Sequence, residues 1–149
     1  KDIIDMGESL GTGVAGYIAS HRDPGAILLV SGMTSIIDAG KSKIMWLNLY
    51  PDSVFPQPTF DNLSIARGKH APLLLVHGEA DNLLTCDFSR RMFSEGSQPK
   101  QLLIVKNTGH NDMFKDENMA PLAKALQTWI AQIDNLQKIN QSLSSAALK

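Results

Sequence analysis

Four short apolar runs constrain the fold of this chain more than any other feature of its sequence. They are rich in Ile, Leu and Val, each is followed by a glycine or a polar turn residue, and they span 3–6, 26–30, 73–77 and 101–105. Runs of this length are typical of β-strands. Their apolarity is nearly continuous rather than alternating, which indicates parallel strands that are buried on both faces of a sheet.

Helical patterns lie between these runs. Small apolar residues predict a helix over 10–20, helical spacing of Phe88, Met92 and Phe93 predicts a second over 86–95, and one apolar face predicts a third over 119–136. The region 38–69 is the least regular, with a helical turn at 45–49 followed by a proline-rich extended loop. Strand and helix in succession predict an α/β fold, a parallel sheet flanked by helices.

Length and composition predict one globular domain. We expect a domain over 1–136 and a polar C-terminal tail over 137–149 that frays or packs loosely. The net charge of −1 gives no electrostatic reason for a nucleic-acid partner, and no apolar run approaches the roughly 18 residues of a transmembrane segment. A single cysteine and no visible signal-peptide pattern favour a cytoplasmic location.

Three polar residues each follow a predicted strand. Ser9 follows the first strand, Asp81 the third and His110 the fourth. The carboxyl ends of parallel strands meet at one edge of a sheet, where functional groups of α/β folds gather. A serine hydroxyl becomes a nucleophile when a histidine takes its proton, and a carboxylate orients that histidine. The arrangement therefore predicts nucleophilic catalysis by Ser9.

The stretch GESLG at residues 7–11 surrounds the candidate nucleophile with glycines. A nucleophilic serine on a strand-to-helix turn needs a sharp, strained backbone. We expect side chains at Gly7 and Gly11 to collide with neighbouring backbone in that turn. The Leu10 amide, at the start of the helix, is expected to donate a hydrogen bond to a developing oxyanion.

These motifs resemble the C-terminal half of a serine hydrolase of the α/β-hydrolase superfamily. The similarity is greatest to small esterase-like and thioesterase-like members that lack a large lid domain, such as the alpha/beta hydrolase domain-containing proteins 13 and 17. Matching stretches appear in family order: GESLGTGVAGYIAS, SGMTSIID, FDNL, APLLLVHGEADNLLT and PKQLLIVKNTGHNDMF. The resemblance implies Ser9 as nucleophile, Asp81 as acid and His110 as base, with the Leu10 amide as one oxyanion donor.

The resemblance also implies that part of the machinery lies outside this sequence. Family members have further strands before the nucleophile strand, and a loop among them supplies the second oxyanion donor. The first residue is Lys1 rather than methionine. We therefore expect the chain to need the N-terminal half of the fold, or a partner chain that supplies it. Without neighbours, the first strand would be an exposed edge prone to self-association.

Several candidate residues are also consistent with a purely structural role. Ser9 is also suited to a helix N-cap, and Asp87 is a rival acid within a predicted helix. Asp112 favours a turn role, and His77 a satisfied position in the core. The candidate acyl pocket of Met33, Met45, Trp46 and Phe55 is equally consistent with core or lid packing.

Other expectations concern reactivity. Cys86 favours a packed position over a reactive one. The four histidines lack acidic or cysteine partners at ligand spacing, so we expect neither a metal site nor a cofactor.

The leading functional hypothesis is a serine hydrolase that cleaves a carboxylic ester or thioester through an acyl-enzyme, with a small-molecule or acylated substrate. A peptidase or acyltransferase would use the same three residues. A non-catalytic binding module with a hydrolase fold is the alternative from another class.

Overall fold

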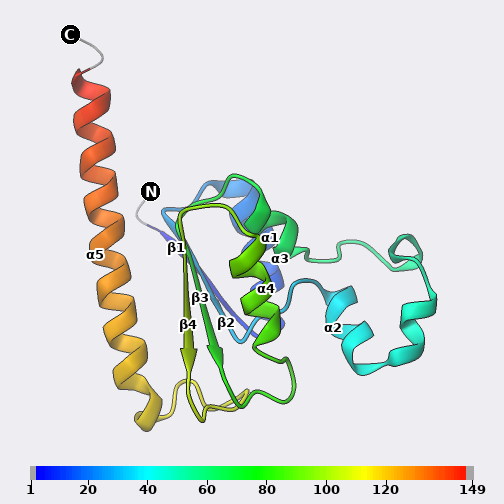
Figure 1. Ribbon diagram of the computed structural model, residues 1–149. Helices are drawn as coiled ribbons and strands as arrows, with labels where there is room; N and C mark the ends of the chain where they lie inside the picture. The colour runs from blue at the N-terminus through cyan, green and yellow to red at the C-terminus, as the bar shows by residue number, and fades with distance from the viewer. Residues whose placement is uncertain (1–2, 147–149) are drawn as a thin grey trace.

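The four apolar runs form one parallel sheet in the computed structural model, which describes residues 3–146 (Figure 1). The strands lie side by side in chain order: β1 (Ile4–Glu8), β2 (Ala26–Val30), β3 (Leu73–Gly78) and β4 (Lys100–Val105). Every pairing is parallel. The predicted α/β class and all four predicted strands are confirmed, with bounds that shift by two residues at most.

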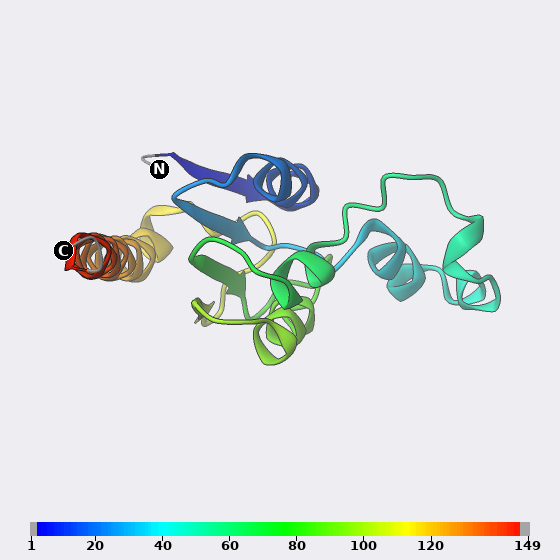
Figure 2. The ribbon, with the colours of Figure 1, turned by 90° about the horizontal axis from the view of Figure 1, so that it is seen from above.

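Helices cover both faces of this sheet. Figure 2 shows α1 (Gly11–Arg22), α3 (Asn62–Arg67) and α4 (Asp87–Glu95) on one side and α5 (Asp116–Ala146) on the other. Successive side chains of a strand point to opposite faces. In β3, Leu73 and Leu75 pack in the core under α1, α3 and α4, whereas Leu74 and Val76 pack in the core under α5. Burial on both faces explains the continuous apolar runs of β2 and β3, whereas the expectation of such burial is wrong for β1 and β4, whose residues are mostly exposed or half-buried.

The predicted helices at 10–20 and 86–95 correspond to α1 and α4, whereas α5 is longer than its apolar pattern. The amides of Asn118 and Met119 both donate to the Lys115 carbonyl, so the helix begins before the predicted residue 119. Acidic Asp116 and Glu117 in its first turn favour that start through the helix dipole. The helix also continues beyond residue 136 to Ala146. The division of the chain at residue 136 stays a prediction.

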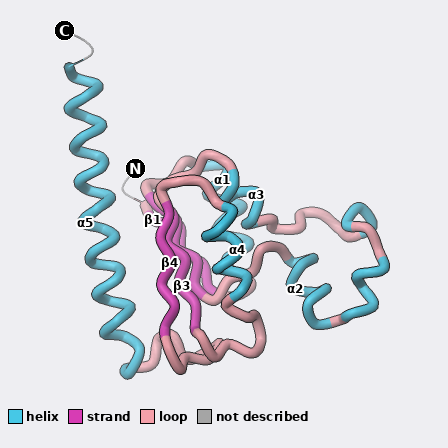
Figure 3. Tube along the Cα trace, in the orientation of Figure 1, coloured by secondary structure: helices cyan, strands magenta, loops and turns pink. Residues whose placement is uncertain are grey.

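The region predicted to be least regular contains two helices that its pattern did not reveal. They are α2 (Ile36–Lys43) and α3, and short 3₁₀ turns lie between them at Met45–Leu49 and Asp52–Val54. Each of the two helices begins at a capping side chain, Ser35 for α2 and Asp61 for α3. The helical turn expected at 45–49 is confirmed. Figure 3 shows α2 and the loops after it projecting to one side of the sheet.

Candidate active site

Ser9 lies in a strained turn between β1 and α1, residues 7–11, which we call the Ser9 turn. Its φ is 53°, in the left-handed region that residues with side chains rarely adopt. Three hydrogen bonds hold it there. The Ser9 amide donates to Val30 O at 2.9 Å, and the amide and hydroxyl of Thr12 donate to Ser9 O at 3.1 and 2.6 Å. The surrounding structure thus maintains the strain, as is common at functional sites.

The two glycines of the Ser9 turn differ. A Cβ added to Gly7 would lie 2.3 Å from Gly11 O and 2.7 Å from Thr12 Cα, so the expected collision with backbone is confirmed there. The same expectation is wrong for Gly11, where an added Cβ would meet nothing within 4 Å. Gly11 is already the first residue of α1, and its Cβ direction points into open space.

The structure brings Ser9, His110 and Asp81 together in one hydrogen-bonded series. Ser9 Oγ lies 2.8 Å from His110 Nε2, and His110 Nδ1 lies 2.7 Å from Asp81 Oδ2. A carboxylate only accepts, so Nδ1 carries the proton and the Nε2 lone pair faces the serine hydroxyl. This is the tautomer that lets an imidazole take a proton from serine. The Ser9 side chain is thus engaged with His110, and α1 has no side-chain cap.

A close backbone approach brings the loops that carry Asp81 and His110 side by side. We call them the Asp81 loop (79–86) and the His110 loop (106–115). A Cβ on Gly78, at the end of β3, would lie 2.2 Å from Thr108 O, so only glycine fits there. The amide of Ala80 donates to that same carbonyl at 3.0 Å, and Thr108 Oγ1 donates to Asn118 of α5 at 3.0 Å. Glycine at position 78 thus permits the two loops to meet.

The Asp81 carboxylate is buried, and donors surround it. Its Oδ1 accepts from the amides of Leu83 and Leu84, both at 2.9 Å, while Oδ2 accepts from His110. Its side chain is fully inaccessible to solvent. A buried charge is costly unless it is hydrogen-bonded, and these contacts satisfy the anion.

The rival acid Asp87 and the predicted turn residue Asp112 both have partners other than His110. Asp87 is exposed on α4 and pairs with Arg90 at 3.0 Å. Asp112 accepts from the Gly109 amide and pairs with Lys115, whose hydrogen bond lowers the pKa of the Asp112 carboxyl. The expected turn role of Asp112 is confirmed.

His77 occupies the expected core position, with one feature that sequence reasoning missed. Its ring is fully buried, with Nδ1 2.7 Å from Ser89 Oγ and Nε2 2.8 Å from Leu84 O. Nε2 also lies 3.3 Å from Asp81 Oδ2. Desolvation lowers the pKa of His77. In the sequence, the one signal of this approach was the spacing of four residues between His77, at a strand end, and the candidate acid Asp81.

Cys86 is also buried, as expected. Within residues 3–146, no group of three or more His, Cys, Asp or Glu side chains is arranged to hold a metal ion. In that same part of the chain, no helix combines the length and apolarity needed to cross a membrane.

The Leu10 amide lies at the start of α1, directly after Ser9. Among the described residues, it donates to no protein acceptor. Free N–H groups at a helix N-terminus favour a negative charge. Its role as an oxyanion donor stays a prediction.

The four candidate pocket residues do not share one environment. Met33 is buried near Gly13 of α1, and its carbonyl accepts from Asn62 at 3.0 Å. Met45 and Trp46 are 85% and 61% exposed, and Phe55 is half-buried. A shared acyl pocket therefore stays a prediction.

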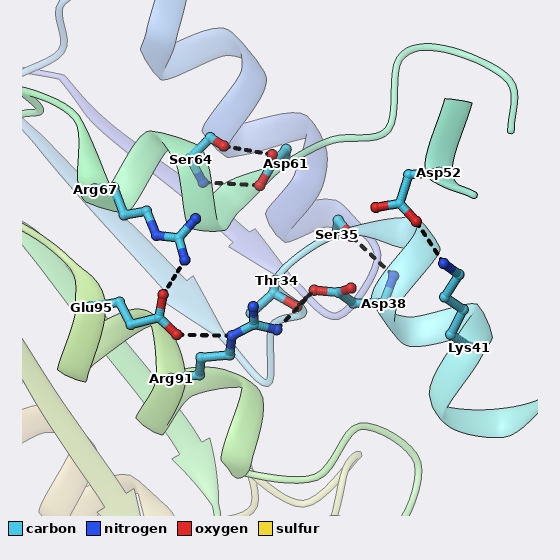
Figure 4. A network of polar contacts seen from close by, with 10 residues as sticks. All are labelled: Thr34, Ser35, Asp38, Lys41, Asp52, Asp61, Ser64, Arg67, Arg91 and Glu95. Atoms are coloured by element: carbon cyan, nitrogen blue, oxygen red, sulfur yellow. Dashed lines mark hydrogen bonds and ion pairs between the residues drawn. The ribbon is translucent and has the colours of Figure 1, made fainter. Parts of the chain in front are cut away.

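Polar contacts anchor the projecting segment that carries three of these residues (Figure 4). Arg91 of α4 donates to Asp38 of α2 at 3.3 Å and to Glu95 at 3.0 Å, and Glu95 also pairs with Arg67 of α3. Solvent screens exposed ion pairs, so these contacts stabilise the segment only weakly. Lys43 Nζ also donates to Asn82 O at 2.8 Å, which places the end of α2 beside the Asp81 loop.

Known proteins were compared with this chain by sequence and by structure. No family model matches the chain. An uncharacterized protein of Mycobacterium tuberculosis is 33% identical over 107 residues, which cover 72% of this chain and 37% of the relative. The human alpha/beta hydrolase domain-containing protein 17B is 24% identical over 115 residues, 76% of this chain and 37% of that protein. The chain thus spans little more than a third of these relatives' length.

A likeness to solved structures extends over most of the chain. The esterase domain of a Rhodothermus marinus protein superposes with a TM-score of 0.64 at 15% identity, over 85% of this chain and 58% of that domain's chain. At this identity the likeness establishes the fold, four parallel strands flanked by helices.

Proposed function

Because this chain belongs to the α/β-hydrolase superfamily, we propose that it carries the nucleophile, acid and base of a serine hydrolase that cleaves carboxylic ester or thioester bonds. The observation that carries the proposal is the hydrogen-bonded series from Ser9 through His110 to Asp81. The left-handed backbone of Ser9, with a φ of 53°, supports it, because strained backbone is common at functional sites.

In the proposed mechanism, Ser9 Oγ attacks the acyl carbon while His110 Nε2 takes its proton. Asp81 stabilises the imidazolium that forms, and the Leu10 amide donates to the oxyanion. His110 then returns the proton to the departing alcohol or thiol, which leaves Ser9 acylated. Water, deprotonated by His110, attacks the ester carbon of the acyl-enzyme. The tetrahedral intermediate that forms then collapses: the bond from the acyl carbon to Ser9 Oγ breaks, His110 returns the proton to Ser9 Oγ, and the carboxylic acid is released.

The site is proposed to be completed by protein outside this chain. The chain spans 37% of each of two curated relatives. In the described part of the chain, β1 has a strand partner on one side only, and Ile4 and Met6 are exposed on it. We propose that the N-terminal half of the fold, or a partner chain that supplies it, pairs with this edge. That half is also the proposed source of the second oxyanion donor.

Trapping of the acyl-enzyme tests the proposal. The full-length protein is mixed with an activated ester, a matched thioester and a matched amide, quenched early and weighed by mass spectrometry. We expect the acyl mass on the wild-type protein with the ester and the thioester, and none on a Ser9→Ala variant. Faster acylation by the amide would favour a peptidase. No acyl mass with any of the three would favour the non-catalytic alternative.

A further inference from the structure

A second imidazole reaches the carboxylate that orients His110. Asp81 Oδ2 lies 2.7 Å from His110 Nδ1 and 3.3 Å from His77 Nε2. The His110 ring approaches this oxygen from the His110 loop, and the His77 ring approaches it from the end of β3. The other carboxylate oxygen, Oδ1, accepts from the amides of Leu83 and Leu84. His77 is fully buried and cannot contact a substrate directly.

The hydrogen-bond partners of His77 determine its tautomer. The Leu84 carbonyl, 2.8 Å from Nε2, only accepts, so Nε2 carries a proton. That proton is donated to the Leu84 carbonyl, and the Asp81 carboxylate lies 3.3 Å from the same nitrogen. Nδ1 then presents a lone pair, which accepts from the Ser89 hydroxyl at 2.7 Å. Burial lowers the pKa of His77 and so favours this neutral form.

These contacts join three parts of the fold at the Asp81 loop. His77 belongs to β3, Ser89 to α4, and the Leu84 carbonyl to the Asp81 loop itself. The Asp81 carboxylate in turn closes its own loop through the amides of residues 83 and 84. A shift of the His77 ring would therefore move the loop carbonyl and the carboxylate together.

We propose that His77 is a positioning residue, which holds the Asp81 loop, and with it the Asp81 carboxylate, against His110 by donating from Nε2 to the Leu84 carbonyl, with Ser89 setting the orientation of its ring. The proposal rests on the proposed function, since it assigns His77 a part in the same reaction. His77 acts through Asp81 and touches neither Ser9 nor the acyl group.

Two amide substitutions separate this role from mere core packing. The amide of glutamine reaches about as far as Nε2, and that of asparagine about as far as Nδ1. His77→Gln should therefore keep a donor for the Leu84 carbonyl, whereas His77→Asn should keep only a partner for Ser89. In the full-length protein, we expect His77→Asn to lower kcat for ester hydrolysis up to about 100-fold with little change in KM, and His77→Gln to stay near wild type.

Ser89→Ala provides a second variant if His77→Asn fails to fold. It removes the contact that orients the ring and leaves Nε2 in place, so we expect a smaller loss of kcat at unchanged KM. A folded His77→Asn protein with wild-type kcat would overturn the proposal. So would equal losses in His77→Asn and His77→Gln, because packing alone would explain them.

A spectroscopic readout distinguishes failure of this inference from failure of the proposed function. The proton on His110 Nδ1, bonded to Asp81, should give a strongly downfield NMR resonance. We expect His77→Asn to move it and His77→Gln to keep it. A wild-type protein without hydrolytic activity would refute the proposed function, whereas a resonance that is the same in both variants would refute the positioning role.

Discussion

Replacement of Gly7 by alanine should break the Ser9 turn, whereas the same change at Gly11 should leave it intact. A Cβ on Gly7 would lie 2.3 Å from Gly11 O, 2.6 Å from Gly11 C and 2.7 Å from Thr12 Cα, against 3.4 Å or more for ordinary contact. All three are backbone atoms of the turn or of α1, so no flexible side chain can yield. The turn must move by about 1 Å, which costs about 1–3 kcal/mol of overpacking.

The same displacement should also slow the chemistry. A shift of about 1 Å at a reacting group can lower a rate about 100-fold. Gly11→Ala adds an identical Cβ where nothing lies within 4 Å, and should stabilise the fold by about 0.4–1 kcal/mol through the unfolded state. Urea unfolding and the rate of Ser9 acylation, measured for both variants in the full-length protein, provide the assay. Equal effects of the two substitutions on both quantities would refute the reasoning.

Three further predictions follow from the site and the sheet. Asp81→Asn should lower kcat about 10⁴-fold, because the amide would favour the His110 tautomer that cannot accept the serine proton. The control Asp87→Asn should have no effect on kcat. Similar rates in the two variants would count against the assignment of Asp81. Because burial lowers the pKa of His77, the unfolded state binds its proton more readily. The free energy of unfolding should therefore fall as the pH drops below about 6.5, by at most about 1.4 kcal/mol per pH unit from this group. Urea titrations at several pH values should show that part missing in His77→Gln, and an unchanged pH dependence would contradict it. Residues 1–149 in isolation should self-associate through the β1 edge, and Met6→Lys should reduce this; a sharp monomer peak for the unmodified chain in size-exclusion chromatography would argue against that edge.

The strands, and the meeting of Ser9, Asp81 and His110 at one edge of the sheet, could be predicted because they depend on strong local signals. β2 and residues 73–76 of β3 are buried on both faces, so these stretches are apolar without interruption. Ser9, Asp81 and His110 each follow such a run, and parallel strands place their carboxyl ends at one edge. The positions of these residues in the sheet thus follow from chain order and strand direction alone.

Other features depend on contacts that no local pattern encodes. α2 and α3 are short and capped, and they lie in a region whose prolines indicate loop. Gly11 differs from Gly7 only in the direction in which a Cβ would point. His77 reads as a core residue, and its approach to Asp81 arises from the way the Asp81 loop folds back over the end of β3. Such contacts between neighbouring loops become visible only in three dimensions.

Covalent labelling with a fluorophosphonate probe tests the central claim most directly, since such probes react with activated serines. In the full-length protein, peptide mapping should place the probe on Ser9, and labelling should disappear in Ser9→Ala. It should persist in Ser20→Ala, which changes an exposed serine on α1 that bonds only to its own helix turn. An unlabelled wild-type protein, or equal labelling of the wild type and Ser9→Ala, would contradict the assignment of Ser9 as the nucleophile.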